Sequence, residues 1–311
     1  MTACNCGALG EYKDPFNPYS LEYCSSCFSA YLEKKILRGV RRRVRGHPIA
    51  VAVSGGKDSL VLLNVLYSYQ NELKLSSLIA LILEEEIPDI QQERQKIIQY
   101  LHKHYSDLPI NIVKYSELFG HTLPHLVTIN DSKKLGFTPC SICGIFRKQA
   151  LFQMSLQAGV DFIALGTTLE DEASTIILNI IRGFPTLSPT QNSYSNDSNT
   201  QRLPQRIKPL ARISEDLIRI YIRIKNIPII SQTCPYAQRS LRSEITAFIS
   251  TLKDRDPQGS FLFNILKTKN DSERKTSFPQ NTYHCTRCQM ISHHSLCPSC
   301  RILSNLLESS F

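Results

Sequence analysis

The sequence of 311 residues lacks the long apolar segments that membrane proteins require. No stretch of it reaches the roughly 18 to 20 consecutive apolar residues of a transmembrane helix, and its first residues contain no hydrophobic signal segment. We therefore expect no membrane anchor and a cytoplasmic location. With 42% hydrophobic residues, the composition suits one sizeable α/β core with small appendages.

Acidic residues are also in short supply. The chain has 27 of them against 36 lysines and arginines, so its formal net charge is +9, which favours a polyanionic partner. The densest basic run places seven cations between positions 34 and 45: Lys34, Lys35, Arg38, Arg41, Arg42, Arg43 and Arg45. This run is equally consistent with a nucleic-acid contact and with a solvated helix face.

Cysteine, by contrast, is abundant, with 11 residues. Without a secretion signal, this usage indicates metal or redox chemistry rather than disulfides. Near the C-terminus, two CxxC pairs predict a closed, structural zinc site: Cys285, Cys288, Cys297 and Cys300. A less regular N-terminal set predicts a second zinc site, with unliganded thiols as the alternative: Cys4, Cys6, Cys24 and Cys27.

The three remaining cysteines lie in the middle of the chain, as Cys140 and Cys143 of a CxxC pair and as Cys234. Three thiolates are one ligand short of closing a zinc or iron–sulfur site. The residues alone leave four interpretations open: a [4Fe–4S] cluster with one open iron, zinc with a fourth ligand of another type, a redox or persulfide-bearing CxxC, and buried inert thiols.

The motif with the clearest chemistry is Ser54-Gly55-Gly56-Lys57-Asp58-Ser59, which directly follows the apolar run 49–53. We call residues 54–59 the glycine loop. A strand that ends in such a loop and opens a helix offers backbone N–H groups and a positive helix end to a phosphate, while Lys57 adds a cation. Its spacing differs from that of a Walker A loop, so a kinase or GTPase is not indicated.

The pattern around this loop alternates between strands and helices. We predict strands over 49–53, 77–83, 110–114 and 162–166, and helices over 57–69, 90–104, 144–157, 170–182, 214–225 and 240–253. The side chains of Ile176, Ile177, Ile180 and Ile181 are expected to form the apolar side of helix 170–182. This alternation predicts a doubly wound parallel sheet of the α/β class, with a ligand crevice at the carboxyl ends of its strands.

The domain organisation follows from these patterns. We expect an N-terminal zinc module over 1–30, a basic helical connector over 31–47, a nucleotide-binding domain with the central cysteines over 48–256, and a C-terminal helix with a zinc module over 257–311. The polar stretch 188–205 is expected to be a surface loop, and 227–230 a short strand or turn.

Taken together, the motifs resemble one family along nearly the whole chain. In order, these are the N-terminal cysteine module, a strand with SGGKDS, CxxCGxFR, LGTTxEDEAS, KPL, CPYA and the C-terminal double knuckle. The combination is similar to that of the tRNA 2-thiouridine synthetases of the PP-loop ATP pyrophosphatase superfamily. This resemblance implies a PP-loop, Rossmann-like fold and cytoplasmic tRNA thiolation.

The resemblance also implies a reaction and its cofactors. ATP, with Mg²⁺, would adenylate the C2 oxygen of a tRNA uridine, and sulfur would then displace AMP at C2. Cys140, Cys143 and Cys234 would hold a [4Fe–4S] cluster, beside two zinc ions. The implied partners are tRNA, a ubiquitin-like sulfur-carrier protein, and either a second copy of the chain or a related subunit.

Several further residues receive roles from their positions in these motifs. Arg147 is expected to contact developing negative charge, and Asp171 to bind Mg²⁺ or assist proton transfer. Val53 and Leu83 are expected to flank the adenine, and Gly166 to lie in the crevice. The structural alternative for Arg147 and Asp171 is a helix-surface charge or a partner of the helix dipole.

The chain departs from the family pattern at two places. Thr167 and Glu170 replace a histidine and an aspartate, and Glu84-Glu85-Glu86 replaces an Asp-Glu-Gly stretch. Two alternatives to uridine thiolation stay open, and these changes bear on the second of them. One is another PP-loop reaction, such as cytidine thiolation or amidation, and the other is a non-catalytic tRNA-binding subunit.

Overall fold

The computed structural model describes residues 4–16, 22–183, 203–230, 234–237, 240–256, 258–273, 283–292 and 294–307. Its centre is a five-stranded sheet with the order β3-β2-β1-β4-β5. In that order the strands span Ile110–Lys114, Ser77–Glu84, Pro48–Ala52, Phe162–Leu165 and Gln205–Ile207. All four pairings between neighbours are parallel, which confirms the predicted sheet.

Helices cover both faces of this sheet, as a doubly wound fold requires. One hydrophobic cluster joins β1, β2 and β4 to α3 (Lys57–Ser68), α4 (Pro88–His104) and α9 (Glu215–Lys225). The other joins the opposite side chains of the strands to α5 (Tyr115–Phe119), α6 (Leu123–Ser132), α7 (Pro139–Gln157) and α12 (Pro298–Leu307). Strands buried on both faces read as continuous apolar runs, which is why β1 and β2 were predictable.

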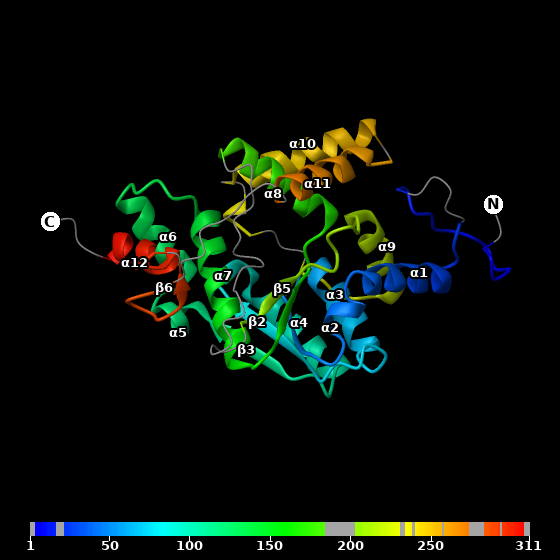
Figure 1. Ribbon diagram of the computed structural model, residues 1–311, viewed down its shortest axis with the longest axis horizontal. Coiled ribbons are helices and arrows are strands. Elements are labelled where there is room, and N and C mark those ends of the chain that lie inside the picture. Colours follow the sequence, from blue (N-terminus) through cyan, green and yellow to red (C-terminus); the bar gives the residue numbers. More distant parts are fainter. Residues whose placement is uncertain are drawn as a thin grey trace.

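A third cluster forms where α8 (Leu169–Ile181) packs against α10 (Leu241–Arg255) and α11 (Ser260–Glu273), above the sheet in Figure 1. The predicted apolar side of α8 is wrong in part. Ile180 and Ile181 are 56% and 58% exposed, whereas Leu169, Ala173 and Leu178 form the core contact. α10 and α11 cover the earlier part of α8, and the exposed Ile180 and Ile181 lie in its last turn.

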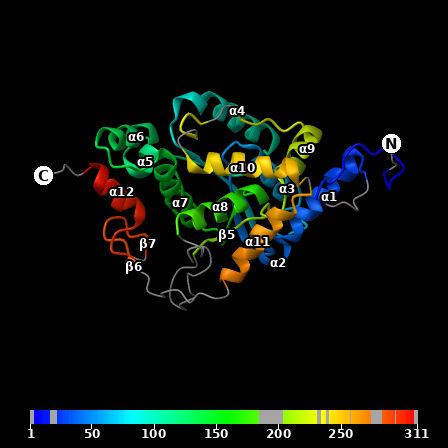
Figure 2. The same cartoon turned by 90° about the horizontal axis from the view of Figure 1, so that it is seen from above.

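The two cysteine modules lie at opposite ends of the molecule (Figures 1 and 2). The N-terminal module leads into α1 (Ser25–Arg38) and the short α2 (Arg41–Val44), and Gly39 caps the end of α1. The C-terminal module consists of the strand pair β6 (Tyr283–His284) and β7 (Ile291–Ser292) followed by α12. Ile302, Leu303 and Leu306 of α12 are buried in the same cluster as α7.

The connecting segments differ in part from the predictions. β5 was not predicted, because a strand of three residues carries too short a pattern. The loop was predicted over 188–205, and its residues 188–202 lie outside the described residues. The segment 227–230 contains no strand, but the Ile230 N–H donates to the Gly55 carbonyl oxygen at 3.0 Å. Among the described residues, no helix is both long and apolar enough to cross a membrane.

Candidate functional site

The glycine loop lies between β1 and α3, at the carboxyl edge of the sheet. Gly55 has a φ of +84°, and a Cβ atom there would clash with the side chain of Ile230. The Ser59 hydroxyl donates to the Gly56 carbonyl oxygen at 2.9 Å and accepts from the Ser54 N–H at 3.2 Å. α3 starts without a side-chain cap, so its N-terminal N–H groups are available to a phosphate.

Two charged residues follow the glycines. The Lys57 ammonium lies 3.1 Å from an Asp58 carboxylate oxygen and 3.0 Å from one of Glu215. Burial raises the pKa of Asp58 to about 6, although Lys57 acts in the opposite direction. The Oδ1 atom of Asp58 is buried and has no hydrogen-bond partner among the described residues. A buried carboxylate oxygen without a donor is suited to a cation that arrives with a substrate.

Gly166 follows β4 and touches the start of α3. A Cβ atom at this position would lie 2.8 Å from the Ser59 backbone nitrogen and 2.9 Å from the Asp58 carbonyl carbon. Only a glycine therefore permits this close approach between the end of β4 and the start of α3. Gly166 thus lies beside the glycine loop, and its place in a ligand crevice stays a prediction.

Asp171 lies in the first turn of α8, where it acts as a helix cap. Its Oδ2 accepts hydrogen bonds from the N–H and the hydroxyl of Thr168, each at 3.1 Å, and the Thr168 hydroxyl accepts from the Asp171 N–H. This capping box fixes the start of the helix. Asp171 is also close enough to Asp58 to help raise its pKa.

The central cysteines gather around the N-terminal half of α7. The Cys140 thiol donates to the Tyr236 carbonyl oxygen at 3.6 Å, and Tyr236 follows Cys234 by two residues. Cys143 and Cys234 both pack against the α7 side of the sheet and are close enough to interact electrostatically. The three thiols thus come from two segments of the chain that meet at one place.

Arg147 and a buried glutamate surround Cys143. A guanidinium N–H of Arg147 donates to the Cys143 sulfur at 3.3 Å and to a carboxylate oxygen of Glu85 at 2.7 Å. Glu85 is only 5% exposed, and its other oxygen lies 2.7 Å from Arg94. Burial raises the pKa of the Cys143 thiol, and Arg147 opposes that effect. Arg147 therefore lies beside the Cys143 sulfur, and its contact with developing negative charge stays a prediction.

The other two glutamates of the altered stretch have different surroundings. Glu84 is buried at the end of β2. Glu86 adopts a φ of +58° and accepts hydrogen bonds from the N–H and hydroxyl of Ser116 at 2.8 and 2.9 Å. Glu86 therefore adopts the left-handed backbone conformation that a glycine would favour. Its side chain also links this turn to α5 through Ser116.

Val53 and Leu83 both lie buried at the carboxyl edge, but on opposite faces of the sheet. Val53 belongs to the cluster with α3, and Leu83 to the cluster with α7. The Leu83 carbonyl oxygen accepts from Arg94 at 2.8 Å. Their contact with adenine stays a prediction.

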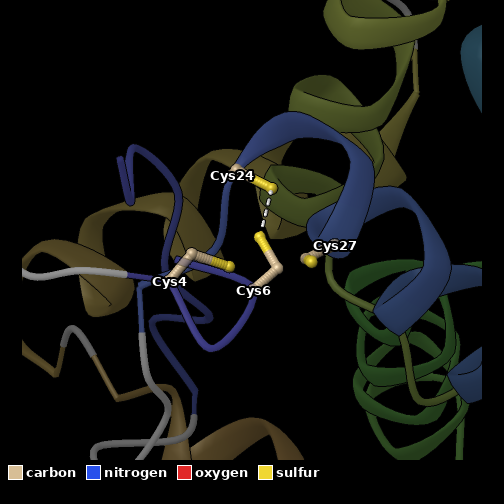
Figure 3. A group of neighbouring side chains, drawn as sticks. All are labelled: Cys4, Cys6, Cys24 and Cys27. Carbon is tan, nitrogen blue, oxygen red and sulfur yellow. Dashed lines mark hydrogen bonds between the residues drawn. The ribbon is translucent and has the colours of Figure 1, made fainter. Parts of the chain in front are cut away.

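The N-terminal cysteines form a compact group (Figure 3). The ligand atoms of Cys4, Cys6, Cys24 and Cys27 all lie within 4.8 Å of one another, and the sulfur atoms of Cys6 and Cys24 are 3.6 Å apart. A tetrahedron with Zn–S bonds of about 2.3 Å has sulfur atoms about 3.8 Å apart. Backbone N–H groups, first that of Cys6, lower the pKa of the Cys4 thiol to about 6 and so favour a thiolate.

The C-terminal cysteines form a second group with the same properties. Cys285, Cys288, Cys297 and Cys300 also lie within 4.8 Å of one another, with 3.7 Å between two of their sulfur atoms. The Cys297 N–H donates to the Cys285 sulfur at 3.3 Å. Both groups could hold a metal ion, as the sequence predicted. Within the described part of the chain, the three central thiols do not approach one another this closely.

Sequence reasoning missed three contributors. Glu85 was treated only as a departure from the family pattern, yet it joins Arg147 to Arg94. The Tyr115 hydroxyl lies 3.7 Å from the Cys143 sulfur. Gln149 of α7 contacts the sulfur atoms of Cys288 and Cys297 at 3.6 and 3.4 Å. Glu85 follows directly after the strand end at Glu84, and that position at the carboxyl edge was the available signal.

Comparison with known proteins identifies the family. A model described as the PP-loop domain matches residues 29–249. The chain belongs to the PP-loop family. Within this family, cytoplasmic tRNA 2-thiolation protein 1 of Drosophila melanogaster is 30% identical, over 97% of this chain and 86% of its own length. A probable sulfurtransferase of Methanocaldococcus jannaschii is 28% identical, over 98% of this chain and 88% of its own.

A solved structure agrees with these relatives. The U34-tRNA thiolase NcsA from Methanococcus maripaludis, determined with its [4Fe–4S] cluster, superposes on this PP-loop protein with a TM-score of 0.81. The two sequences are 25% identical, and the match covers 100% of this chain and 99% of the archaeal one. The family resemblance drawn from the motifs is confirmed, together with the fold.

Proposed function

We propose that this PP-loop protein catalyses ATP-dependent 2-thiolation of a tRNA uridine, at the wobble position that the name of the archaeal thiolase indicates. The observation that carries the proposal is the placement of three thiols and Arg147 beside the strand ends that also bear the glycine loop. The end of β1 continues into this loop, and the end of β2 continues into Glu85, which holds Arg147 at Cys143. Both halves of the reaction therefore share one edge of the sheet.

ATP would bind as a substrate with its phosphates on the glycine loop. The N–H groups at the start of α3 and the Lys57 ammonium supply the positive charge for the pyrophosphate end. The buried Oδ1 atom of Asp58 supplies an oxygen ligand for Mg²⁺, with Asp171 nearby as a further carboxylate. Val53, Leu83 and Gly166 would border the nucleoside.

The chemistry proceeds in two steps. The C2 oxygen of the uridine attacks the α-phosphorus of ATP, and pyrophosphate leaves. A sulfide nucleophile then adds to C2, and the C2–O bond breaks with release of AMP. Arg147, which is 48% exposed, is positioned by Glu85 to stabilise the negative charge that develops near Cys143.

The three central thiols fit a cluster better than a single ion. Four-iron cubanes are larger than one zinc ion and need ligands farther apart, and these thiols are less closely gathered than the two terminal groups. Cys140, Cys143 and Cys234 would hold the [4Fe–4S] cluster. Three protein ligands would leave one iron of such a cluster open, and that iron would supply a binding site for sulfide.

The terminal cysteine groups would each hold one structural Zn²⁺. Four thiolates leave zinc no open position, so neither site takes part in catalysis. A ubiquitin-like carrier is proposed as the physiological sulfur donor, the cytoplasm as the location, and a second copy of this chain or a related subunit as a partner.

The test uses protein purified without oxygen. We expect visible absorption from an iron–sulfur cluster, two zinc ions per chain, and AMP formation that requires tRNA and sulfide. Mass spectrometry of digested tRNA should show 2-thiouridine. A colourless protein that contains zinc alone and releases no tRNA-dependent AMP would contradict the proposal, and 2-thiocytidine as the product would favour the alternative reaction.

A matched pair of variants separates the sulfur site from the zinc sites. Cys234→Ala should abolish thiolation and remove iron while both zinc ions remain. Cys6→Ala should lower the zinc content and leave the iron in place. Retained thiolation in Cys234→Ala would place the sulfur chemistry elsewhere.

A further inference from the structure

Four cations from three segments of the chain lie close together near the carboxyl edge of the sheet. Lys148 follows Arg147 on α7, Arg206 lies in β5, Lys208 directly follows β5, and Arg242 lies in the first turn of α10. We call these four residues the cation cluster. A guanidinium N–H of Arg206 donates to the Lys148 carbonyl oxygen at 3.1 Å, and one of Arg242 donates to the Thr175 hydroxyl at 3.0 Å. The cluster therefore spans the gap between α7 and α8.

The cluster carries an excess of positive charge. Lys208 pairs with the buried carboxylate of Glu172. Arg206, Lys208 and Arg242 all lie near enough to Lys148 to repel its ammonium group. The mutual repulsion of like charges falls when an anion binds among them.

The cluster also has the right position relative to the proposed chemistry. Lys148 is the residue after Arg147, and Thr175 lies one helical turn beyond Asp171 on α8. Lys208 lies at the carboxyl edge, because β5 runs parallel to β4 and Ile207 pairs with Ala164. The cluster thus lies at the same edge of the sheet as the glycine loop.

We infer that the cation cluster binds the phosphate backbone of the RNA substrate next to the nucleotide that enters the crevice. This inference rests on the proposed function, since it locates the partner of that same site. Two of the four members are arginines, whose planar guanidinium groups suit phosphate oxygens. ATP phosphates have their own cradle in the glycine loop, so a polyanion is the better match for a second group of cations.

The basic run 34–45 is a weaker candidate for this role. Lys35 pairs with Asp14 at 2.7 Å, and Arg41 with Glu72 at 3.4 Å. Arg43 lies over the ring of Phe162 and donates to Gln205. Several of its cations are thus already engaged, which favours the solvated-face interpretation of the sequence pattern.

The experiment measures the affinity of the anaerobically purified protein for labelled tRNA over a range of salt concentrations. Each lost phosphate contact should reduce the slope of log K against log salt by about 0.7 to 0.9. The double variant Lys148→Ala with Arg242→Ala should therefore lose about 1.5 units of slope and bind tRNA at least about tenfold more weakly at moderate salt. Both side chains are exposed, so folding should be unaffected.

The control is Arg41→Ala with Arg42→Ala in the basic run, for which we expect the wild-type slope. ATP binding should be unchanged in the Lys148 and Arg242 variant, which separates RNA phosphate from nucleotide phosphate. A wild-type salt slope in the Lys148 and Arg242 variant would overturn this inference but not the proposed function. The same holds if that variant binds tRNA normally and instead loses binding of an acidic carrier protein. A wild-type protein that binds no tRNA would overturn the proposed function as well.

Discussion

Glu85 offers the sharpest test of how the site is held together. It is 5% exposed and lies 2.7 Å from both Arg94 and Arg147, whose side chains are 8% and 48% exposed. The substitution Glu85→Gln preserves the shape of the side chain but removes its charge. Arg94 would then be a buried cation without a carboxylate, and breaking a buried pair in this way costs about 3 to 5 kcal/mol.

The contribution of Arg147 is smaller, because solvent screens a half-exposed pair to about 1 kcal/mol or less. We therefore expect the free energy of unfolding of Glu85→Gln to fall by about 3 kcal/mol at pH 7, measured by urea denaturation. The control is Glu72→Gln, which removes a pair whose members are 51% and 59% exposed. That variant should lose less than about 1 kcal/mol.

The pH dependence gives an independent check. Burial acts to raise the pKa of Glu85, but Arg147 and Arg94 outweigh it and hold the pKa below its usual value of 4.5. The stabilisation is therefore present above about pH 4.5 and is lost as the pH falls through the lowered pKa. The difference between wild type and Glu85→Gln should shrink on acidification. A loss below 1 kcal/mol at pH 7, or a difference that grows in acid, would refute the reasoning.

Three further predictions concern the loop, the crevice and the metal. Asp58→Asn should lower the rate of adenylation on the order of 100-fold. Its free energy of unfolding at pH 7.5 should nevertheless rise, by up to about 3 kcal/mol. Its raised pKa of about 6 means that folding loses stability as the pH rises from about 4 to 6, so the gain should vanish near pH 4 in pH-dependent denaturation. Gly166→Ala should weaken ATP binding more than tenfold by calorimetry, because the new Cβ meets the Ser59 nitrogen at 2.8 Å, whereas Gly144→Ala, with no atom within 4 Å, should not. Cys288→Ser should reduce zinc from two ions to one per chain by metal analysis and lower the melting temperature, and a variant that retains both ions would disprove the C-terminal site.

Much of the sheet was readable because its signals are local. β1 and β2 are unbroken apolar runs, and the glycine loop follows β1 directly, so both the strands and the phosphate site could be predicted. The two cysteine groups that could hold a metal ion were equally accessible, since the short spacing within each cysteine pair brings its two sulfur atoms together. β5 was missed because its pairing with β4 depends on residues 40 or more positions away in the chain.

Other features could not be predicted from the sequence because they depend on contacts between distant segments. Glu85 looked like one of three similar acids, and its importance depends on Arg94 reaching it from α4 and Arg147 from α7. Ile180 and Ile181 continued the apolar pattern of α8 although no helix of the described chain covers them. The sequence pattern of a helix shows which side of it is apolar, but the packing of neighbouring helices decides how far along the helix that side is buried.

The contact between α7 and the C-terminal module has a practical consequence. Gln149 touches two sulfur atoms of that module, while Ile302, Leu303 and Leu306 cover apolar side chains of the same layer as α7. A chain shortened before residue 283 would expose this surface to water on the helix that carries Cys140 and Cys143. The smallest fragment able to keep a stable sulfur-bearing helix must therefore include the last turns of the protein, although they lie far from the nucleotide.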